Sequence, residues 1–102
     1  MIHVLAIITT KPGQREAVLD AYRANLPAVQ AEDGCIEYGA VVDAADAGPI
    51  QLPLGPDSFV VVEKWASLDA LRAHAAAPHM AAYAAKTKDL IASRVIHVLS
   101  PV

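Results

Sequence analysis

The stretch Phe59-Val60-Val61-Val62-Glu63-Lys64-Trp65 has the strongest strand character in the sequence, because β-branched and aromatic residues fit the pleated surface of a sheet. Side chains alternate between the two faces of a strand, so Glu63 and Trp65 lie on the same face as Phe59. The opposite face carries two of the valines, and both faces are therefore largely apolar. This pattern predicts a strand that is covered on both sides.

The segments around this strand predict the order βαββαβ. They are an apolar strand at residues 2–9, a helix from Gln14 to about Glu32, a strand at residues 35–43, a helix from Ser67 to about Ala77, a continuing helical segment from Pro78 to about Ala92, and a last strand at residues 95–99. Pro27 lies inside the first helix and predicts a bend near Leu26, because proline removes a backbone donor. The order is typical of a ferredoxin-like α+β fold, an antiparallel sheet with both helices on one face.

The first strand is also apolar on both faces, with Val4 and Ile8 on one side and Leu5 and Ile7 on the other. Helices on one side of a sheet leave the other side open to water. A second copy of the sheet packing face to face supplies the missing cover. We therefore expect a homodimer in the form of a dimeric α+β barrel.

Composition sets the class of protein. The chain has 102 residues, of which 55% are hydrophobic and 19% charged, which predicts one globular domain spanning residues 1–102. The net charge of −3 and the lack of a basic cluster argue against partners such as nucleic acid or an anionic membrane. No apolar run is long enough for a membrane span, so we expect a cytoplasmic protein. The single Cys35 is interpreted as a buried structural thiol.

A loop insertion at residues 43–58 is much longer than an ordinary hairpin turn, and its prolines and glycines oppose regular structure. Ile50, Leu52 and Leu54 alternate within it. Two interpretations remain open: a flexible insertion, or a segment that adds an edge strand or reaches over a neighbouring subunit.

Three residues are candidates for chemistry. A buried Glu63 would have a raised pKa and exchange protons with a substrate, while Trp65 would supply a flat wall. His74 falls on the helical stripe that should face the sheet. The alternatives are a solvated Glu63 at a strand end, a core Trp65, and a His74 that caps or packs.

The segment from Glu63 to His79 resembles the central signature of the antibiotic biosynthesis monooxygenase family: Glu-x-Trp at the end of a strand, then a helix that opens on Ser or Asp and contains a His. Lys11-Pro12-Gly13 and the junction Asp33-Gly34-Cys35-Ile36-Glu37-Tyr38 also look like the family's. The resemblance implies a dimeric α+β barrel. For some relatives it implies oxygenation of a small quinol or polycyclic phenol by dioxygen, with no cofactor.

On this resemblance, Glu63 or His74 is the proton acceptor and Trp65 the aromatic wall. Tyr38, His79 and Tyr83 become candidate substrate-binding residues. Haem degradation is disfavoured, because the first strand lacks the Asn of haem-degrading relatives. No metal is expected, since no pair of histidines has a recognised ligand spacing. The alternative function is a non-catalytic dimeric barrel that binds a hydrophobic small molecule or a protein partner.

Overall fold

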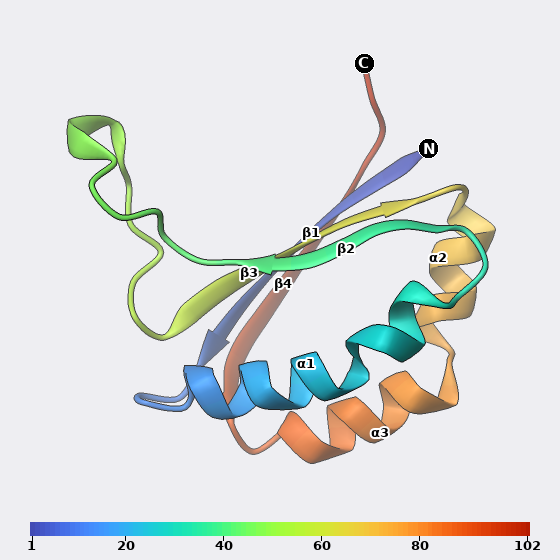
Figure 1. Cartoon of the computed structure of the whole chain (residues 1–102), viewed down its shortest axis with the longest axis horizontal. Coiled ribbons are helices and arrows are strands. Elements are labelled where there is room, and N and C mark those ends of the chain that lie inside the picture. The colour runs from blue at the N-terminus through green and yellow to red at the C-terminus, as the bar shows by residue number, and fades with distance from the viewer.

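The computed structural model describes all residues from 1 to 102 and places them in a four-stranded sheet with three helices on one face (Figure 1). The strands are β1 (Ile2–Thr10), β2 (Cys35–Val41), β3 (Ser58–Trp65) and β4 (Ile91–Leu99), and the helices are α1 (Arg15–Gln30), α2 (Leu68–Ala75) and α3 (Pro78–Thr87). The sheet has the order β2-β3-β1-β4, and every neighbouring pair is antiparallel. The predicted ferredoxin-like α+β fold is confirmed.

The ends of some elements differ from the prediction. β4 begins at Ile91 and not at residue 95, and α3 ends at Thr87 although the alanine-rich sequence favours helix up to Ala92. The reason is tertiary: Ile91 pairs with Thr10 of β1, and this ladder outweighs local helix propensity. α1 runs through Pro27 to Gln30, and Figure 1 shows its last turns stepping out of line with the first, as the proline predicts.

The helix-covered face has two chemically different ends. The apolar end consists of seven buried residues that pack α1 on β1 and β3: Ala6, Ile8, Val18, Leu19, Tyr22, Phe59 and Val61. The polar end lies where β3 runs into α2, and it combines the buried apolar group Val4, Val29 and Trp65 with the ionisable side chains Glu32, Glu63 and His74. The register of β1 and β3 sets this division, because Ile8 lies opposite Phe59 and Val4 lies opposite Glu63.

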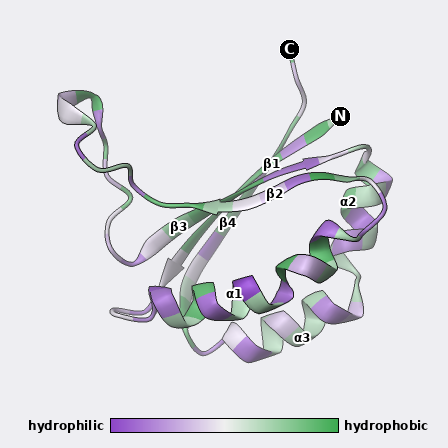
Figure 2. Ribbon diagram, viewed as in Figure 1, coloured by the Kyte–Doolittle hydropathy of each residue, from purple (hydrophilic) through white to green (hydrophobic).

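The other face of the sheet has no helix against it, yet it is apolar. At its centre Leu5 lies opposite Val62, and Ile7 lies opposite both Val60 and Val95. Val95 keeps 48% of its surface exposed. Figure 2 shows hydrophobic residues recurring along the strands and hydrophilic residues recurring along α1. The expectation that both faces of the sheet are apolar is met.

Residues 42–57 form an arm between β2 and β3 that contains one short 3-10 turn and no edge strand. The Asp43 carboxylate shapes it by accepting hydrogen bonds from the backbone N–H groups of Leu54 (2.8 Å) and Gly55 (3.0 Å). The side chains of Ile50 and Leu52 remain 92% and 89% exposed. Figure 1 shows the arm projecting on the side of the sheet away from the helices. None of the helices is long and apolar enough to cross a membrane.

Candidate active site

A cavity of about 380 Å³ opens beside the polar end, between the helix-covered face of the sheet and the helices α2 and α3. Its volume falls within the range of roughly 300–1,000 Å³ found for small-molecule sites. Seventeen residues line it and fourteen of them are hydrophobic. The other three are Glu63, His74 and Arg94. A few polar groups in an apolar chamber are what a site for a small aromatic molecule requires.

Glu63 and Trp65 interact directly, as their spacing on one face of β3 allows. The Trp65 indole N–H donates a hydrogen bond of 2.9 Å to Oε1 of Glu63. Trp65 is fully buried and lies behind His74, with the two ring centres 4.6 Å apart, so it does not reach the cavity surface. The structure therefore places Trp65 as a support for Glu63 and His74, and not as the wall expected from the sequence.

Burial raises the pKa of Glu63 above its ordinary value, while the hydrogen bond from Trp65 and the nearby His74 lower it in part. The raised pKa means that this carboxyl group keeps its proton to a higher pH than a solvated glutamate does. Only 6% of the residue is exposed, and it faces the cavity. Glu63 is therefore buried, as a proton-exchanging role requires.

His74 lines the cavity from α2 and is held from behind by Glu32. Its Nδ1 lies 2.7 Å from Oε2 of Glu32. An ionised carboxylate only accepts hydrogen bonds, so we assign the ring hydrogen to Nδ1. Nε2 has no partner within the chain and, in the neutral ring, carries a lone pair that can accept a proton from a molecule in the cavity.

Gly34 brings Glu32 and α2 together. The glycine has φ +82°, and a Cβ at this position would lie 2.6 Å from the Cβ of Ala70 in α2. Ser67 begins α2 by accepting a hydrogen bond from the Ala70 N–H at 3.1 Å. The turn after α1 therefore packs directly on the first turn of the helix that carries His74.

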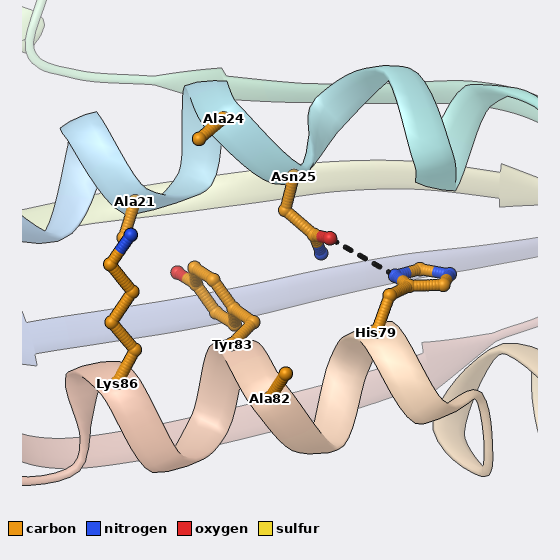
Figure 3. Close-up of a pocket in the computed structure, with 7 residues that line it drawn as sticks. All are labelled: Ala21, Ala24, Asn25, His79, Ala82, Tyr83 and Lys86. Atoms are coloured by element: carbon orange, nitrogen blue, oxygen red, sulfur yellow. Dashed lines mark hydrogen bonds between the residues drawn. The ribbon is translucent and has the colours of Figure 1, made fainter.

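Two of the three predicted substrate-binding residues line the cavity. Tyr38 and Tyr83 both face it, and burial raises the pKa of each hydroxyl, so both remain hydrogen-bond donors. The ring of Tyr38 meets that of His74 edge-on, with centres 5.4 Å apart. His79 lies outside the cavity, in a groove of about 210 Å³ between α1 and α3 (Figure 3).

Two residues at or beside the cavity have no signal in the sequence. Arg94 lines the cavity from β4, whereas the sequence pattern places it between a helix that ends near Ala92 and a strand that begins at residue 95. Glu32 is separated from His74 by 42 positions, and only their contact in space reveals the pair. Cys35, expected to be buried, is half-buried beside Trp65, and burial raises the pKa of its thiol.

Comparison with known proteins agrees with this geometry. Residues 1–86 match the family described as antibiotic biosynthesis monooxygenase. The "Probable quinol monooxygenase YgiN" of Escherichia coli strain K12 is 42% identical over 103 residues, covering 99% of this chain and 98% of that protein. This chain belongs to the antibiotic biosynthesis monooxygenase family.

Solved structures share the fold of this chain. PA3566 from Pseudomonas aeruginosa is similar with a TM-score of 0.80 and 26% identity, over 99% of this chain and 93% of that one. Rv0793 from Mycobacterium tuberculosis is similar with a TM-score of 0.79 and 27% identity, over 99% and 94% of the two chains. Because these matches span the arm as well as the sheet, the whole chain shares the architecture of its relatives.

Proposed function

We propose that this protein is a monooxygenase that oxidises a small quinol or phenolic aromatic with dioxygen and needs no bound cofactor. The observation that carries the proposal is that His74, with a free Nε2, and Glu63 both line a cavity whose other residues are mostly hydrophobic. The likeness to a probable quinol monooxygenase supports the same choice of substrate class.

The chemistry follows from the reactivity of the substrate. His74 Nε2 removes the proton of the substrate hydroxyl, with Glu63 as the alternative acceptor, and the resulting phenolate is electron-rich enough to reduce dioxygen directly. One oxygen atom enters the ring and the other leaves as water, so the ring supplies all four electrons. A hydroquinone thereby becomes a hydroxyquinone. The cavity contributes by holding the two reactants together and excluding bulk water.

Three other polar groups suit the same substrate. The hydroxyls of Tyr38 and Tyr83 can donate hydrogen bonds to substrate oxygens because both phenols stay protonated. The Arg94 guanidinium lines the cavity from β4 and carries a permanent positive charge. A cation at this position stabilises the phenolate and the reduced oxygen that follow proton removal.

Oxygen consumption by chelator-treated protein with a panel of hydroquinones tests the proposal. We expect turnover above the spontaneous rate, and a loss of about 10²–10⁴-fold in His74→Ala, the usual contribution of a general base. Arg72→Ala is the matched control, since Arg72 is on the same helix with its side chain 72% exposed. Equal turnover in His74→Ala contradicts the proposal. Tight binding of quinols without oxygen uptake favours the alternative, a non-catalytic barrel that binds hydrophobic molecules.

We also propose that two copies pair through the open face of the sheet. This face is apolar at its centre, and the arm with its exposed Ile50 and Leu52 projects on the same side (Figure 1). Val62→Lys should convert a dimer to a monomer in sedimentation experiments, because it places a charge among Leu5 and its neighbours. Ala85→Lys, on the exposed side of α3, should leave the dimer intact.

A further inference from the structure

Glu32 lies between two histidines that face different spaces. Its Oε2 is 2.7 Å from Nδ1 of His74 and 3.5 Å from Nε2 of His79. His74 lines the cavity, whereas His79 lines the groove between α1 and α3 (Figure 3). Only 16% of the Glu32 side chain is exposed. The carboxylate therefore links the histidine of the inner cavity to the histidine of the outer groove, while Tyr83 lines both spaces.

The neighbours of His79 indicate where its hydrogen lies. Its Nδ1 is 3.1 Å from Oδ1 of Asn25, and the Asn25 amide NH₂ is directed at Sδ of Met80, at 3.3 Å (Figure 3 shows the first of these). An amide oxygen accepts, so Nδ1 of His79 carries a hydrogen and, in the neutral ring, Nε2 carries a lone pair. That Nε2 is buried and has no hydrogen-bond partner.

The contact between Glu32 and His79 therefore joins two acceptors across 3.5 Å. Two facing acceptors repel one another, and one proton between them converts the contact into a charge-assisted hydrogen bond. The three side chains do not form a metal-binding group. The position between Oε2 of Glu32 and Nε2 of His79 can therefore hold one proton, next to the contact of Glu32 with His74.

We propose that Glu32 is a positioning residue that holds His74 with Nε2 toward the cavity, and that the Glu32–His79 contact stores the proton His74 removes from the substrate. This inference rests on the proposed function for the origin of the proton. The substrate hydroxyl gives its proton to Nε2 of His74, and the Nδ1 hydrogen passes to Oε2 of Glu32, where it is shared with His79. In the reverse step Nε2 of His74 gives its proton to the reduced oxygen as water forms, and the stored proton returns from Glu32 to Nδ1. No electron moves along the chain.

Other ionisable groups also face this cluster. Glu63 and Tyr38 approach His74 from β3 and β2. Lys86 lines the outer groove together with His79. Glu63 is another carboxyl group near His74, and its raised pKa makes it a weaker partner for a cation than a solvated carboxylate. Glu32, at 2.7 Å, is therefore the group that holds the ring.

Glu32→Gln tests proton storage while it keeps a side chain of the same size against His74. The variant amide keeps the size of the side chain and its carbonyl can still accept from His74, but it cannot take up a proton. We expect kcat for hydroquinone oxidation to fall about 10²-fold with KM nearly unchanged, together with an altered pH profile. Glu37→Gln is the matched control, on β2 with its side chain 51% exposed, and should behave as wild type. Unchanged kcat in Glu32→Gln overturns the proposal.

A second measurement does not depend on turnover. Nitrogen-15 NMR of the imidazole rings should show His74 with its hydrogen on Nδ1, and a strongly downfield proton between His74 and Glu32 that disappears in Glu32→Gln. His79→Phe should keep this signal while lowering kcat about tenfold, a smaller loss than in Glu32→Gln. A His74 ring with its hydrogen on Nε2 overturns the inference. If the wild type shows these signals but oxidises no quinol, the proposed function fails and the positioning role stands.

Discussion

The apolar end and the polar end of the helix-covered face bury side chains in opposite chemical settings. At the apolar end Val18 and Phe59 are fully buried, and the one side-chain hydroxyl bond is that of Tyr22, which accepts from the Ala40 N–H at 2.9 Å. At the polar end Glu63 and His74 are also buried, with 6% and 5% of their surface exposed, and each needs a partner for its polar atoms. Burial of the apolar end stabilises the folded state. At the polar end part of that stabilisation is lost, because buried ionisable groups give up their contacts with water.

The difference teaches where stability and chemistry reside. Ionisable groups are retained in an interior against their desolvation cost mainly when their reactivity is needed. The hydrogen bonds from Trp65 to Glu63 and from His74 to Glu32 reduce that cost and also fix the directions of the free atoms. Substitutions at the apolar end should therefore change unfolding, and substitutions at the polar end should change turnover.

Phe59→Ala should have the largest effect on folding. It removes a fully buried ring from the apolar end and should lower the free energy of unfolding by about 3–5 kcal/mol. Urea titration followed by the fluorescence of the single Trp65 measures the loss. Turnover per folded molecule should remain close to wild type. A large loss of turnover in protein shown to be folded would mean that the two ends are not separate.

Gly34→Ala tests the packing of the turn after α1 against α2, the helix that carries His74. The new Cβ meets the Cβ of Ala70 at 2.6 Å and the residue must keep φ +82°, so we expect a loss of about 2–4 kcal/mol. The same substitution made in an Ala70→Gly background should cost only the backbone strain, about 1–2 kcal/mol. Equal costs in the two backgrounds would show that the contact with Ala70 is unimportant.

Trp65→Phe tests a single hydrogen bond of the polar end, the one from Trp65 to Glu63. The variant leaves Oε1 of Glu63 without its hydrogen bond, at a cost of about 1–3 kcal/mol. That hydrogen bond lowers the pKa of Glu63, so its loss should move the pKa further upward. Carbon-13 NMR of the Glu63 carboxyl group measures the titration. A pKa that stays in place or falls contradicts the assigned role of Trp65.

Glu63→Gln should give the smallest change in stability, with the opposite sign to the others. Because burial raises the folded-state pKa of Glu63, wild-type stability declines as pH rises from the ordinary value of 4.5 through the raised folded value. Glutamine does not titrate, so the variant should become relatively more stable over this window and remain so above it. Thermal unfolding from about pH 4 to about pH 8 measures the difference. Turnover should fall at the same time, and a variant that is less stable at neutral pH would contradict the assignment.

Much of the fold was predictable from local patterns. Alternation along residues 59–65 identified β3 and placed Glu63 and Trp65 on one face, where the indole reaches the carboxylate. The spacing of apolar residues identified α1, and the predicted order of elements is confirmed. The start of β4 was not predictable, because its first residues are held by pairing with Thr10 and not by their own propensity.

The candidate site was predictable only in part. Of the candidate residues, Tyr38, Glu63, His74 and Tyr83 line the cavity, whereas Trp65 and His79 lie beside it. A side chain on one face of a strand can point into a cavity or lie buried behind another side chain. Which of these occurs depends on how the helix above packs on the sheet. The position of His79 likewise depends on where α3 contacts α1.

By itself, the sequence determined the order of strands and helices, the apolar character of both sheet faces and the placement of Glu63 and Trp65 on one face of a strand, because these depend on repeats of two and about 3.6 residues along the chain. Only the tertiary structure decided that Glu32 meets His74 across 42 positions and that Trp65 is hidden behind His74. Contacts of this kind arise because Gly34 lets the turn after α1 pack on α2. No local sequence pattern predicts a contact between residues so far apart in the chain.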